Sequence, residues 1–362
     1  MSIKELFITL VKIPSPSGHE QGVSKWVAGY LNKLGVDFEM IEGNVVAQIP
    51  GDGPSIVLVA HMDTVQKVGD KIVPIWNGTG FKSGGKTILG ADNKAGVAVL
   101  LSLIKDLTGL KAKPKVIAAF TTKEEAGKMG SWLIPISKYK PTLILNVDGG
   151  KSVGTIDVKA LGQVVFEIEV IGKAAHASLN PEKGIHAIKI AAEIITKINI
   201  GRRAGGDVVN IGFISGGGAT NVVTEQTLLR GELRSFTKAG LQKMQNSLKN
   251  LCKMQEFKHG AKVIYKELPE VGMPVWEETK SVKWLTVFKK AAKKADVKFK
   301  TSVMYASSDA NPLSKHGVAT YSINRGGKNP HSFSESITLA EMKKAKSFIM
   351  EILKLCYPLS RR

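Results

Sequence analysis

Hydrophobic residues in the first part of the chain fall into short continuous runs separated by stretches with helical spacing. The runs at 56–60, 115–120 and 142–147 are mostly apolar. Such runs are typical of strands that are covered on both faces. Between the first two runs, Val97 and Leu100 begin an apolar series with the period of a helix. The pattern predicts an α/β fold with a mixed, largely parallel sheet and helices on both faces.

The two ends of the chain complete this predicted domain. A first helix stops ahead of Pro14, and Gly35 marks the end of a second, because proline and glycine terminate helices. The elements expected here are helices at 3–12, 21–34, within 280–300 and at 338–355, and strands at 37–41, 44–49, 298–305 and 319–323.

Between these two parts the pattern changes at Gly162. Residues 163–171 alternate between apolar and polar side chains, as a strand does when one face is exposed. The β-α-β-β-α-β order predicts a ferredoxin-like α+β lid at 161–268, inserted into a discontinuous domain made of 1–160 and 269–362. The lid's other expected elements are helices at 184–198 and 239–254 and strands at 208–215, 226–235 and 262–268.

Composition favours a soluble globular protein. The 362 residues are 43% hydrophobic, which suits two domains. No run approaches the roughly 18 to 20 apolar residues of a membrane span, and residues 1–9 lack the apolar core of a signal peptide. Cys252 and Cys356 form neither a disulfide framework nor a cysteine metal site. We therefore expect a cytoplasmic protein without a membrane partner.

The net charge of +20 favours contact with acidic partners such as nucleic acid or an anionic surface. The lysines are scattered, however. In the densest segment, Lys280–Lys300, apolar residues recur at helical spacing and lysines fill most of the remaining arc. This segment is either a solvated helix face or an anion-binding patch. The sequence shows no nucleic-acid module with interleaved aromatic residues, so we expect no nucleic-acid partner.

Ionisable residues follow each of the three apolar runs. His61 and Asp63 follow the first run and, two residues apart, project to the same side of an extended chain. Glu124 and Glu125 follow the second run, and Asp148 follows the third. In open α/β sheets, ligands bind beyond the carboxyl ends of the strands. These side chains are therefore expected at one edge of the sheet.

Asp92 joins this set from the start of a helix. Taken alone, an aspartate at that position is usually an N-cap. Adjacent glutamates are usually exposed to solvent, and a histidine at a strand end usually finds its hydrogen-bond partners nearby. Several carboxylates at one sheet edge repel one another unless cations neutralise them. The convergence predicts a site for two divalent cations.

These residues stand in motifs that resemble those of the M20 family of metallopeptidases, and most of all its peptidase T-like (tripeptidase-like) branch. The resemblance covers nearly the whole chain, in order. It implies a zinc-exopeptidase-like fold for the discontinuous, catalytic domain and a lid that often mediates homodimerisation. The matching motifs are HMDTV at 61–65, GADNKAG at 90–96, TTKEEAG at 121–127, NVDGG at 146–150, GKAAHAS at 172–178, GGGATNVV at 216–223 and GGKNPHSFSE at 326–335.

Carried over residue by residue, the resemblance implies ligands for two divalent metal ions. His61, Asp92 and Asp148 would bind one ion. Asp92, Glu125 and His331 would bind the other, so that Asp92 bridges the pair. Zinc is the expected metal, and sites of histidine and carboxylate also accept cobalt or manganese.

The resemblance also implies the catalytic roles in this domain. Asp63 would orient His61, and Glu124 would be the general base that takes a proton from a metal-bridging water. The family often has a cis peptide bond after the bridging aspartate, here between Asp92 and Asn93.

Three lid residues are candidates for substrate contact. His176 either caps a helix start or, as the resemblance implies, donates to the oxyanion of the tetrahedral intermediate. Asn221 and Arg234 match lid positions that contact substrate, and the planar guanidinium of Arg234 suits a peptide carboxylate. The glycines at 216–218 lack the context of a nucleotide loop.

Two acids in the C-terminal part leave alternatives open. The loop 306–311 departs from the glycine-rich form common in the family, which leaves recognition of the peptide end open. Asp309 could hold this loop by local hydrogen bonds. Glu335 is either a partner of His331 or a surface residue.

The function implied is that of a di-zinc exopeptidase of aminopeptidase or tripeptidase type, acting on short peptides. The motifs equally suit an M20-type amidohydrolase that deacylates N-acyl amino acids, because both reactions use the same ions and base. A non-catalytic binding protein on the same fold is the third alternative, and the complete set of metal-ligand positions argues against it.

Overall fold

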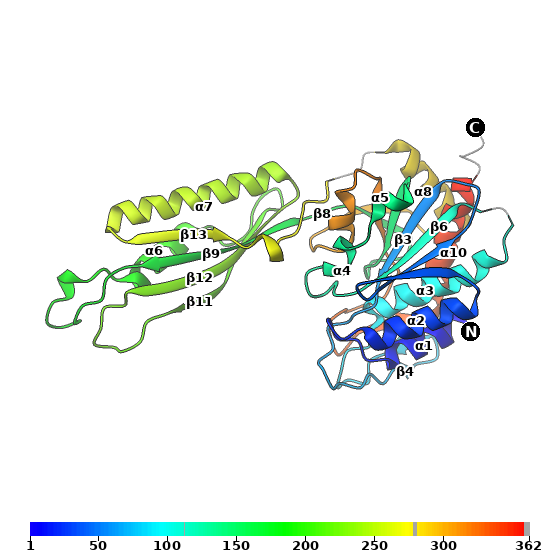
Figure 1. Cartoon of the computed structure of the whole chain (residues 1–362), viewed down its shortest axis with the longest axis horizontal. Helices are drawn as coiled ribbons and strands as arrows, with labels where there is room; N and C mark the ends of the chain where they lie inside the picture. Colours follow the sequence, from blue (N-terminus) through cyan, green and yellow to red (C-terminus); the bar gives the residue numbers. More distant parts are fainter. Residues whose placement is uncertain (112, 278–280, 358–362) are drawn as a thin grey trace. The chain divides into compact units, whose positions relative to one another are not determined.

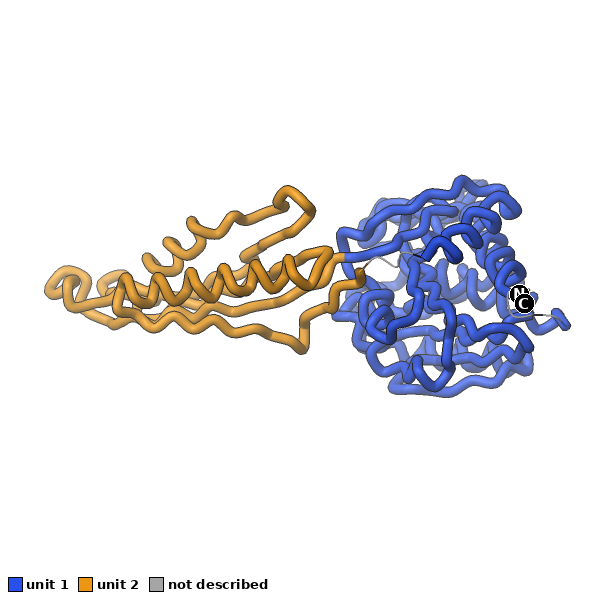
Figure 2. The backbone as a smooth tube through the Cα atoms, turned by 90° about the horizontal axis from the view of Figure 1, so that it is seen from above, with its two compact units in different colours: residues 1–160, 278–362 blue, residues 161–277 orange. Residues whose placement is uncertain are grey.

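The computed structural model describes residues 1–111, 113–277 and 281–357. The chain divides into two compact units, residues 1–160 with 278–362 (unit 1) and residues 161–277 (unit 2), shown in Figure 2. Unit 2 ends after residue 277 and not after 268. Gln163 and Met273 exchange two backbone hydrogen bonds of 2.8 Å, and Val275 is buried in the core of unit 2. These contacts keep 269–277 with the lid.

Unit 1 is built around an eight-stranded sheet in the order β1-β2-β6-β3-β7-β15-β8-β14 (Figure 1). The central strands β6, β3, β7 and β15 run parallel, whereas β2 and β8 run antiparallel to their central neighbours. The strands are β1 (Asp37–Ile41), β2 (Asn44–Ile49), β3 (Ser55–His61), β6 (Lys115–Thr121), β7 (Leu143–Val147), β8 (Thr155–Ala160), β14 (Lys300–Met304) and β15 (Thr320–Ile323). The predicted mixed, largely parallel sheet is confirmed.

Helices cover both faces of this sheet, and β3 shows why its sequence is continuously apolar. Ile56, Leu58 and Ala60 point into one hydrophobic cluster, and Val57 and Val59 point into a second cluster on the other face. The first cluster includes α1 (Ile3–Lys12), α2 (Gln21–Lys33), α3 (Ala91–Thr108), α8 (Val282–Lys294) and α10 (Leu339–Cys356). The second includes α5 (Ile136–Tyr139) and α9 (Ala310–Ser314), and α4 (Met129–Trp132) lies beside α9.

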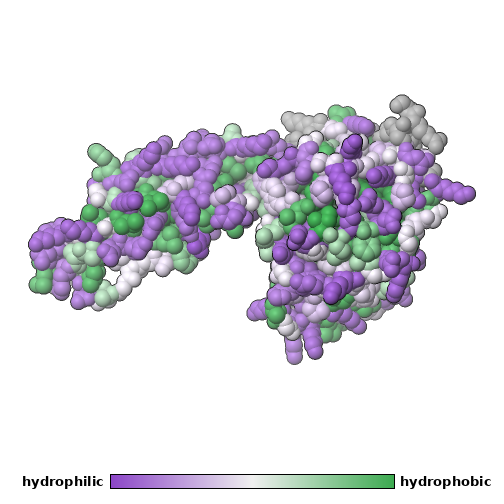
Figure 3. Space-filling view, viewed as in Figure 1, coloured by the Kyte–Doolittle hydropathy of each residue, from purple (hydrophilic) through white to green (hydrophobic). Residues whose placement is uncertain are grey.

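The predicted basic helix is α8. Its apolar side, including Trp284 and Phe288, is buried, whereas Lys289 and Lys293 are exposed. The lysines therefore form a solvated helix face. Figure 3 shows hydrophilic side chains over most of the visible surface of each unit. Among the described residues, no helix is both long and apolar enough to cross a membrane.

Unit 2 is an antiparallel sheet with its helices on one face. The strand order is β10-β11-β12-β9-β13, and β11-β12-β9-β13 is the order of a ferredoxin-like fold. Alternate residues of β9, such as Phe166 and Ile168, pack against α6 and α7. The elements are β9 (Gly162–Ile171), α6 (Ala187–Lys197), β10 (Gly201–Arg202), β11 (Val208–Gly216), β12 (Gln226–Ser235), α7 (Lys238–His259) and β13 (Lys262–Glu267).

A small three-stranded sheet, absent from the predicted elements, organises the glycine-rich segment after β3. Its order is β16-β5-β4, and Ser336 to Thr338 pair with Gly80 to Lys82. These strands are β4 (Ile75–Trp76), β5 (Gly80–Lys82) and β16 (Ser336–Thr338). The pairing joins the loop that precedes Asp92 to the loop that carries His331.

Candidate metal centre

Three adjacent parallel strands deliver the site. His61 is the last residue of β3, which lies between β6 and β7 in the sheet. Glu124 and Glu125 follow β6, and Asp148 directly follows β7. Because carboxyl ends of parallel strands meet at one sheet edge, residues from three distant segments come together.

Two imidazoles lie on opposite sides of the Asp92 carboxylate. His61 Nε2 is 3.5 Å from Asp92 Oδ1 and 4.0 Å from an Asp148 oxygen. His331 Nε2 is 3.4 Å from Asp92 Oδ2 and 2.8 Å from Glu125 Oε1. Asp92 thus offers one oxygen to each side. The structure brings all five predicted metal ligands into one cluster.

The donor set fits divalent cations. One ligand atom from each of His61, Asp92 and Glu125 lies within 4.8 Å of the other two. Imidazole nitrogen and carboxylate oxygen are the ligands that zinc and its neighbours in the first transition row accept. Burial first, and then the nearby charge of Asp92, raise the pKa of Asp148 to about 6. Crowded buried carboxylates of this kind are stabilised when cations neutralise them.

Asp63 contacts the other ring nitrogen of His61, Nδ1, and the backbone of the segment that carries both glutamates. It accepts hydrogen bonds from Ser17 Oγ at 2.6 Å and from the backbone N–H groups of Glu124 and Glu125 at 3.0 Å, and it lies 3.3 Å from His61 Nδ1. Burial would raise its pKa, but hydrogen bonds with His61 and Ser17 lower the pKa to about 2. Asp63 is a charged anchor for the first imidazole and for the segment with both glutamates.

Glu124 is buried but lines an open pocket. Burial raises the pKa of Glu124 well above its usual value, although His61 and the Lys128 ammonium, 3.2 Å from its carboxylate, lower it. The pocket, about 440 Å³ in volume, is also lined by the five predicted ligands and by the loop at 303–308. The Glu124 carboxylate thus lies beside the cluster of predicted metal ligands and is accessible to a molecule bound in the pocket.

Asp92 and Asn93 interrupt the first turn of α3 with non-helical backbone angles, and Asn93, not Asp92, caps the helical turns that follow. Asn93 Oδ1 accepts a hydrogen bond from the backbone N–H of Gly96, three residues on, as an N-cap side chain does. The Asp92 carboxylate is thereby left to face the two imidazoles. The peptide bond between Asp92 and Asn93 is cis, as the resemblance implies.

Glu335 has neither of its two predicted roles. It is 2% exposed, and its carboxylate accepts hydrogen bonds of 2.8 Å from the backbone N–H groups of Leu89, Gly90 and Asp92. It therefore fixes the backbone that carries Asp92. Its negative charge also suits the N–H groups ahead of a helix.

Sequence reasoning missed Arg325, which donates a 2.7 Å hydrogen bond to Asp92 Oδ1. The residue is 2% exposed and stands in a loop without periodicity. Only a lone arginine ahead of GGKNPH could have signalled it. Asp309 is also buried and accepts a 2.6 Å hydrogen bond from Thr121 Oγ1, 188 residues away. That bond is not local; it ties the 306–311 loop to the end of β6.

In unit 2, His176 and Asn221 lie beside each other. The segments around them pair, with a bridge between His176 and Val222 and a 2.9 Å hydrogen bond from Ala177 N to Asn221 O. His176 is exposed, and its Nδ1 accepts from the backbone N–H groups of Ser178 and Leu179 at 3.3 Å. Because Nδ1 is an acceptor, the ring proton of neutral His176 lies on Nε2.

Arg234 is separated from this pair. It lies near the end of β12, which starts after Asn221, so about eight residues at roughly 3.3 Å each lie between them. Its guanidinium makes two hydrogen bonds, of 2.8 and 3.0 Å, to Glu232. One end of β12 therefore carries His176 and Asn221, and the other carries Arg234.

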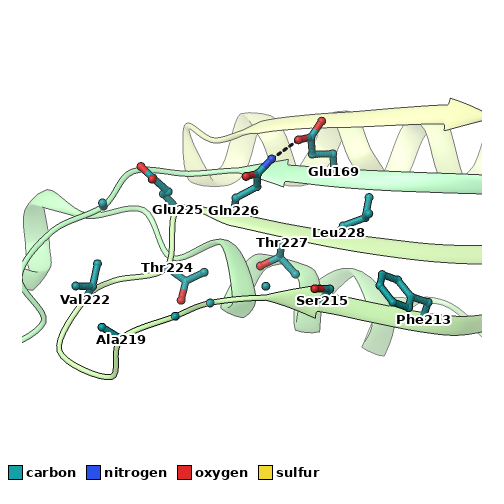
Figure 4. A pocket seen from close by; sticks show the side chains of 14 residues that line it. Glu169, Phe213, Ser215, Ala219, Val222, Thr224, Glu225, Gln226, Thr227 and Leu228 are labelled. Carbon is teal, nitrogen blue, oxygen red and sulfur yellow. Dashed lines mark hydrogen bonds between the residues drawn. The ribbon is translucent and has the colours of Figure 1, made fainter.

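A second pocket lies wholly within unit 2 (Figure 4). It is about 570 Å³ in volume and is lined by the end of β11, the glycines at 216–218 and the start of β12. Its ionisable lining residues are Glu169 and Glu225, and Glu169 accepts a hydrogen bond from Gln226 in Figure 4. Two acids without a histidine make it a poor zinc site.

Comparison with protein families finds two partial matches. Residues 159–258 match the model of the M20 peptidase dimerisation domain, and residues 44–187 match the model of peptidase family M28. The first match covers most of unit 2, and the second covers the strands that carry His61, Glu124, Glu125 and Asp148.

Full-length relatives extend the likeness to the whole chain. The uncharacterized protein YqjE of Bacillus subtilis is 29% identical over 97% of both chains. Peptidase T of a Geobacillus species is 26% identical over 94% of this chain and 92% of its own. Among solved structures, a tripeptidase from Staphylococcus aureus is 25% identical with a TM-score of 0.91, and the aminopeptidase PepT from Bacillus cereus is 27% identical with a TM-score of 0.90. Each of these two likenesses covers 98% of both chains.

Proposed function

This chain belongs to the M20 family of metallopeptidases, in its peptidase T-like branch, and from that premise we propose that it is a di-zinc exopeptidase that hydrolyses short peptides. The observation that carries the proposal is the placement of the Asp92 carboxylate between two imidazoles, with Oδ1 3.5 Å from His61 and Oδ2 3.4 Å from His331. An aspartate with one oxygen on each side is what two adjacent cations require as a bridge.

Each ion would have one histidine and two carboxylates from this chain. His61 and Asp148 would hold the first, Glu125 and His331 the second, and Asp92 both. When bound, a pair of divalent ions polarises the scissile carbonyl and lowers the pKa of water. Asp63 fixes the His61 ring through Nδ1, which leaves Nε2 on the side of Asp92 and free to hold an ion there.

Glu124 would be the general base. It lines the same pocket as the ligands without being one of the five, and Lys128 and the backbone bonds of its own segment to Asp63 hold it in place. Burial raises its pKa, which makes its carboxylate a stronger base for water. It would take the proton from water and return it to the leaving amine.

Unit 2 would supply the substrate contacts. His176, with its proton on Nε2, can donate to the oxyanion of a tetrahedral intermediate, and the neighbouring Asn221 side chain can support it. Arg234 could bind a peptide carboxylate if it exchanges Glu232 for the substrate. A short peptide cannot reach along β12 from the His176–Asn221 pair to Arg234. If all three residues contact one substrate, Arg234 must therefore come from a different subunit than the pair.

A homodimer through unit 2 fits this requirement. Unit 2 matches a peptidase dimerisation domain, and β11 is an edge strand beyond its short pairing with β10. Phe213 and Ile214 on that strand are 44% and 54% exposed. Exposed apolar edge strands pair readily with a second copy.

The decisive experiment compares Glu124→Gln with an exposed control, Glu42→Gln, after loading with zinc, cobalt or manganese. Turnover of di- and tripeptides should fall about 10² to 10⁴-fold in Glu124→Gln while two ions remain bound, and Glu42→Gln should match the unaltered protein. Near-normal turnover in Glu124→Gln removes Glu124 from the mechanism. Cleavage of N-acyl amino acids in preference to free peptides points instead to a deacylase, and inactivity on both panels with two ions bound points to a binding protein.

A further inference from the structure

We propose that Arg325 is a positioning residue that makes the two cation positions unequal, and this inference rests on the proposed di-metal function. The position between His61, Asp148 and Asp92 Oδ1 becomes the weaker one. The position between Glu125, His331 and Asp92 Oδ2 becomes the tighter one. The protein would therefore take up its two ions in a fixed order.

The Arg325 guanidinium is buried and held on three sides. Nη2 donates to Asp92 Oδ1, Nε donates to Asn93 Oδ1, and Nη1 donates to the carbonyl oxygen of Gly326, each at 2.7 Å. Asn93 is itself fixed, because its amide donates to Val147 O and its oxygen caps the helix. The positive charge cannot move away from Asp92 without breaking this set.

The contact is with one carboxylate oxygen and not with the other. Oδ1, which accepts from Arg325, is the oxygen on the His61 side, and Oδ2 is on the His331 side. Glu125 receives no equivalent cation: in the described part of the chain, the one ion-pair partner within 4.0 Å of its carboxylate is His331. The guanidinium therefore contacts ligands of one half of the cluster, whereas Lys128, on the other side, pairs with Glu124 and acts on Glu125 through space only.

The backbone of Arg325 reaches that same half. Its N–H donates to the carbonyl oxygen of Gly149 at 3.1 Å, and Gly149 directly follows Asp148. One residue thus holds the loop of Asp148 through its main chain and the carboxylate of Asp92 through its side chain. The residue positions two of the three ligands on the His61 side while adding a positive charge beside them.

A cation bound to Oδ1 would share that oxygen with the guanidinium. Two positive charges on one oxygen repel, and at the few ångströms involved the repulsion is large even with protein screening. Glu335 and Asp148 also interact electrostatically with Arg325 and offset part of its charge. Glu335 already accepts three backbone hydrogen bonds, however, and does not pair with the guanidinium directly.

The test is a titration of the metal-free full chain with zinc, followed by calorimetry and chelator competition, for the unaltered protein, Arg325→Gln and Arg325→Lys. We expect two steps, with the second at least about tenfold weaker than the first. In Arg325→Gln the weaker step should tighten by about tenfold, because the charge is gone. Arg325→Lys, which keeps the charge, should behave like the unaltered protein. A purely structural role would change the unfolding temperature of the metal-free protein and leave the ratio of the two affinities unchanged.

A second pair of variants assigns the steps even if Arg325→Gln fails to fold. Asp148→Asn should abolish the weaker step, and Glu125→Gln should abolish the tighter one. The opposite assignment, or an unchanged weaker step in folded Arg325→Gln, overturns the inference about Arg325. If the unaltered protein binds no pair of ions, the proposed function itself fails.

Discussion

The candidate functional residues of unit 1 are buried, whereas those of unit 2 lie on its surface or pair locally. In unit 1, Asp63, Glu124 and Arg325 are at most 4% exposed; Asp63 and Arg325 bond to distant segments, and Glu124 is held by the nearby Lys128 and by a backbone bond to Asp63. In unit 2, His176 and Asn221 are exposed on loops, and Arg234 pairs with Glu232 two residues away on the same strand. The first arrangement is preorganised, because burial and distant partners fix each group before a ligand arrives.

The difference follows from the sheets. A parallel sheet covered on both faces brings several carboxyl ends to one buried edge, whereas the antiparallel sheet of unit 2 packs its helices on one face only. Unit 1 therefore brings all five candidate metal ligands together from its own residues. The roles that we propose for His176, Asn221 and Arg234 require a substrate held by a further surface.

The largest difference in effect is expected between substitutions of Asp63, which contacts the His61 imidazole, and Glu232, which pairs with Arg234. Asp63→Asn removes the charge that fixes His61, and its amide NH2 replaces the oxygen that accepts from the backbone N–H of residue 124 or of residue 125. Metal affinity and kcat/KM should fall about 10- to 100-fold. Glu232→Gln breaks a half-exposed pair with Arg234 and should change the free energy of unfolding by less than about 1 kcal/mol. Equal losses of metal affinity in both variants would contradict the contrast.

An intermediate effect is expected on the β11 edge. Phe213→Asp places a charge on the strand that we propose to pair with a second copy, so the dimer should dissociate at least about tenfold more readily. Light scattering over a concentration series measures this. Phe257→Asp is the matched control, since Phe257 is 94% exposed on α7 and away from that edge. Dissociation caused by Phe257→Asp alone would move the interface to the helical face.

The smallest effect concerns an exposed ion pair in unit 2. Glu193 accepts hydrogen bonds from Lys258 at 2.6 Å and His259 at 3.0 Å, and Lys258 first, then His259, lowers the pKa of Glu193 to about 2. A lowered folded-state pKa stabilises the protein above the ordinary value of 4.5, and this contribution disappears as the pH falls towards 2. Calorimetry should show Glu193→Gln slightly less stable than the unaltered protein near neutral pH, with the gap closing between pH 4.5 and 2. A gap that widens in acid would show that the pairs do not stabilise unit 2.

Most of the fold could be predicted because hydrophobic spacing decides it. The helix at 3–12 and the strands at 37–41, 44–49 and 226–235 have the predicted bounds. The helix α7 continues past the predicted residue 254 until Gly260, whose φ of +63° ends it. Strand β8 was not predicted because it carries Asp157 and Lys159, and its Asp157 is buried against polar partners that lie far away in the sequence.

His61, Glu125 and Asp148 could be placed together because strand ends can be read from the sequence, Asp92 was expected from a helix start, and His331 followed from the family resemblance alone. The supports of Asp92 could not be read from the sequence, since each depends on a contact between distant segments. Arg325 and Asp92 are 233 residues apart, and Glu335 and Asp92 are 243 residues apart. Neither loop has a periodic pattern that would place its side chains. The family resemblance implied the ligands and the base, whereas Arg325 and Glu335 reach Asp92 only through the folding of distant loops.

The chain enters and leaves unit 2 through neighbouring segments, since Gln163 and Met273 face each other across an antiparallel bridge. The eight-stranded sheet of unit 1 includes no strand from the intervening residues. A segment whose two ends meet in this way can be gained, lost or exchanged during evolution without a change in the chain path of the domain that carries it. The candidate metal centre lies within unit 1, so a different lid joined at these two ends would bring it a different substrate.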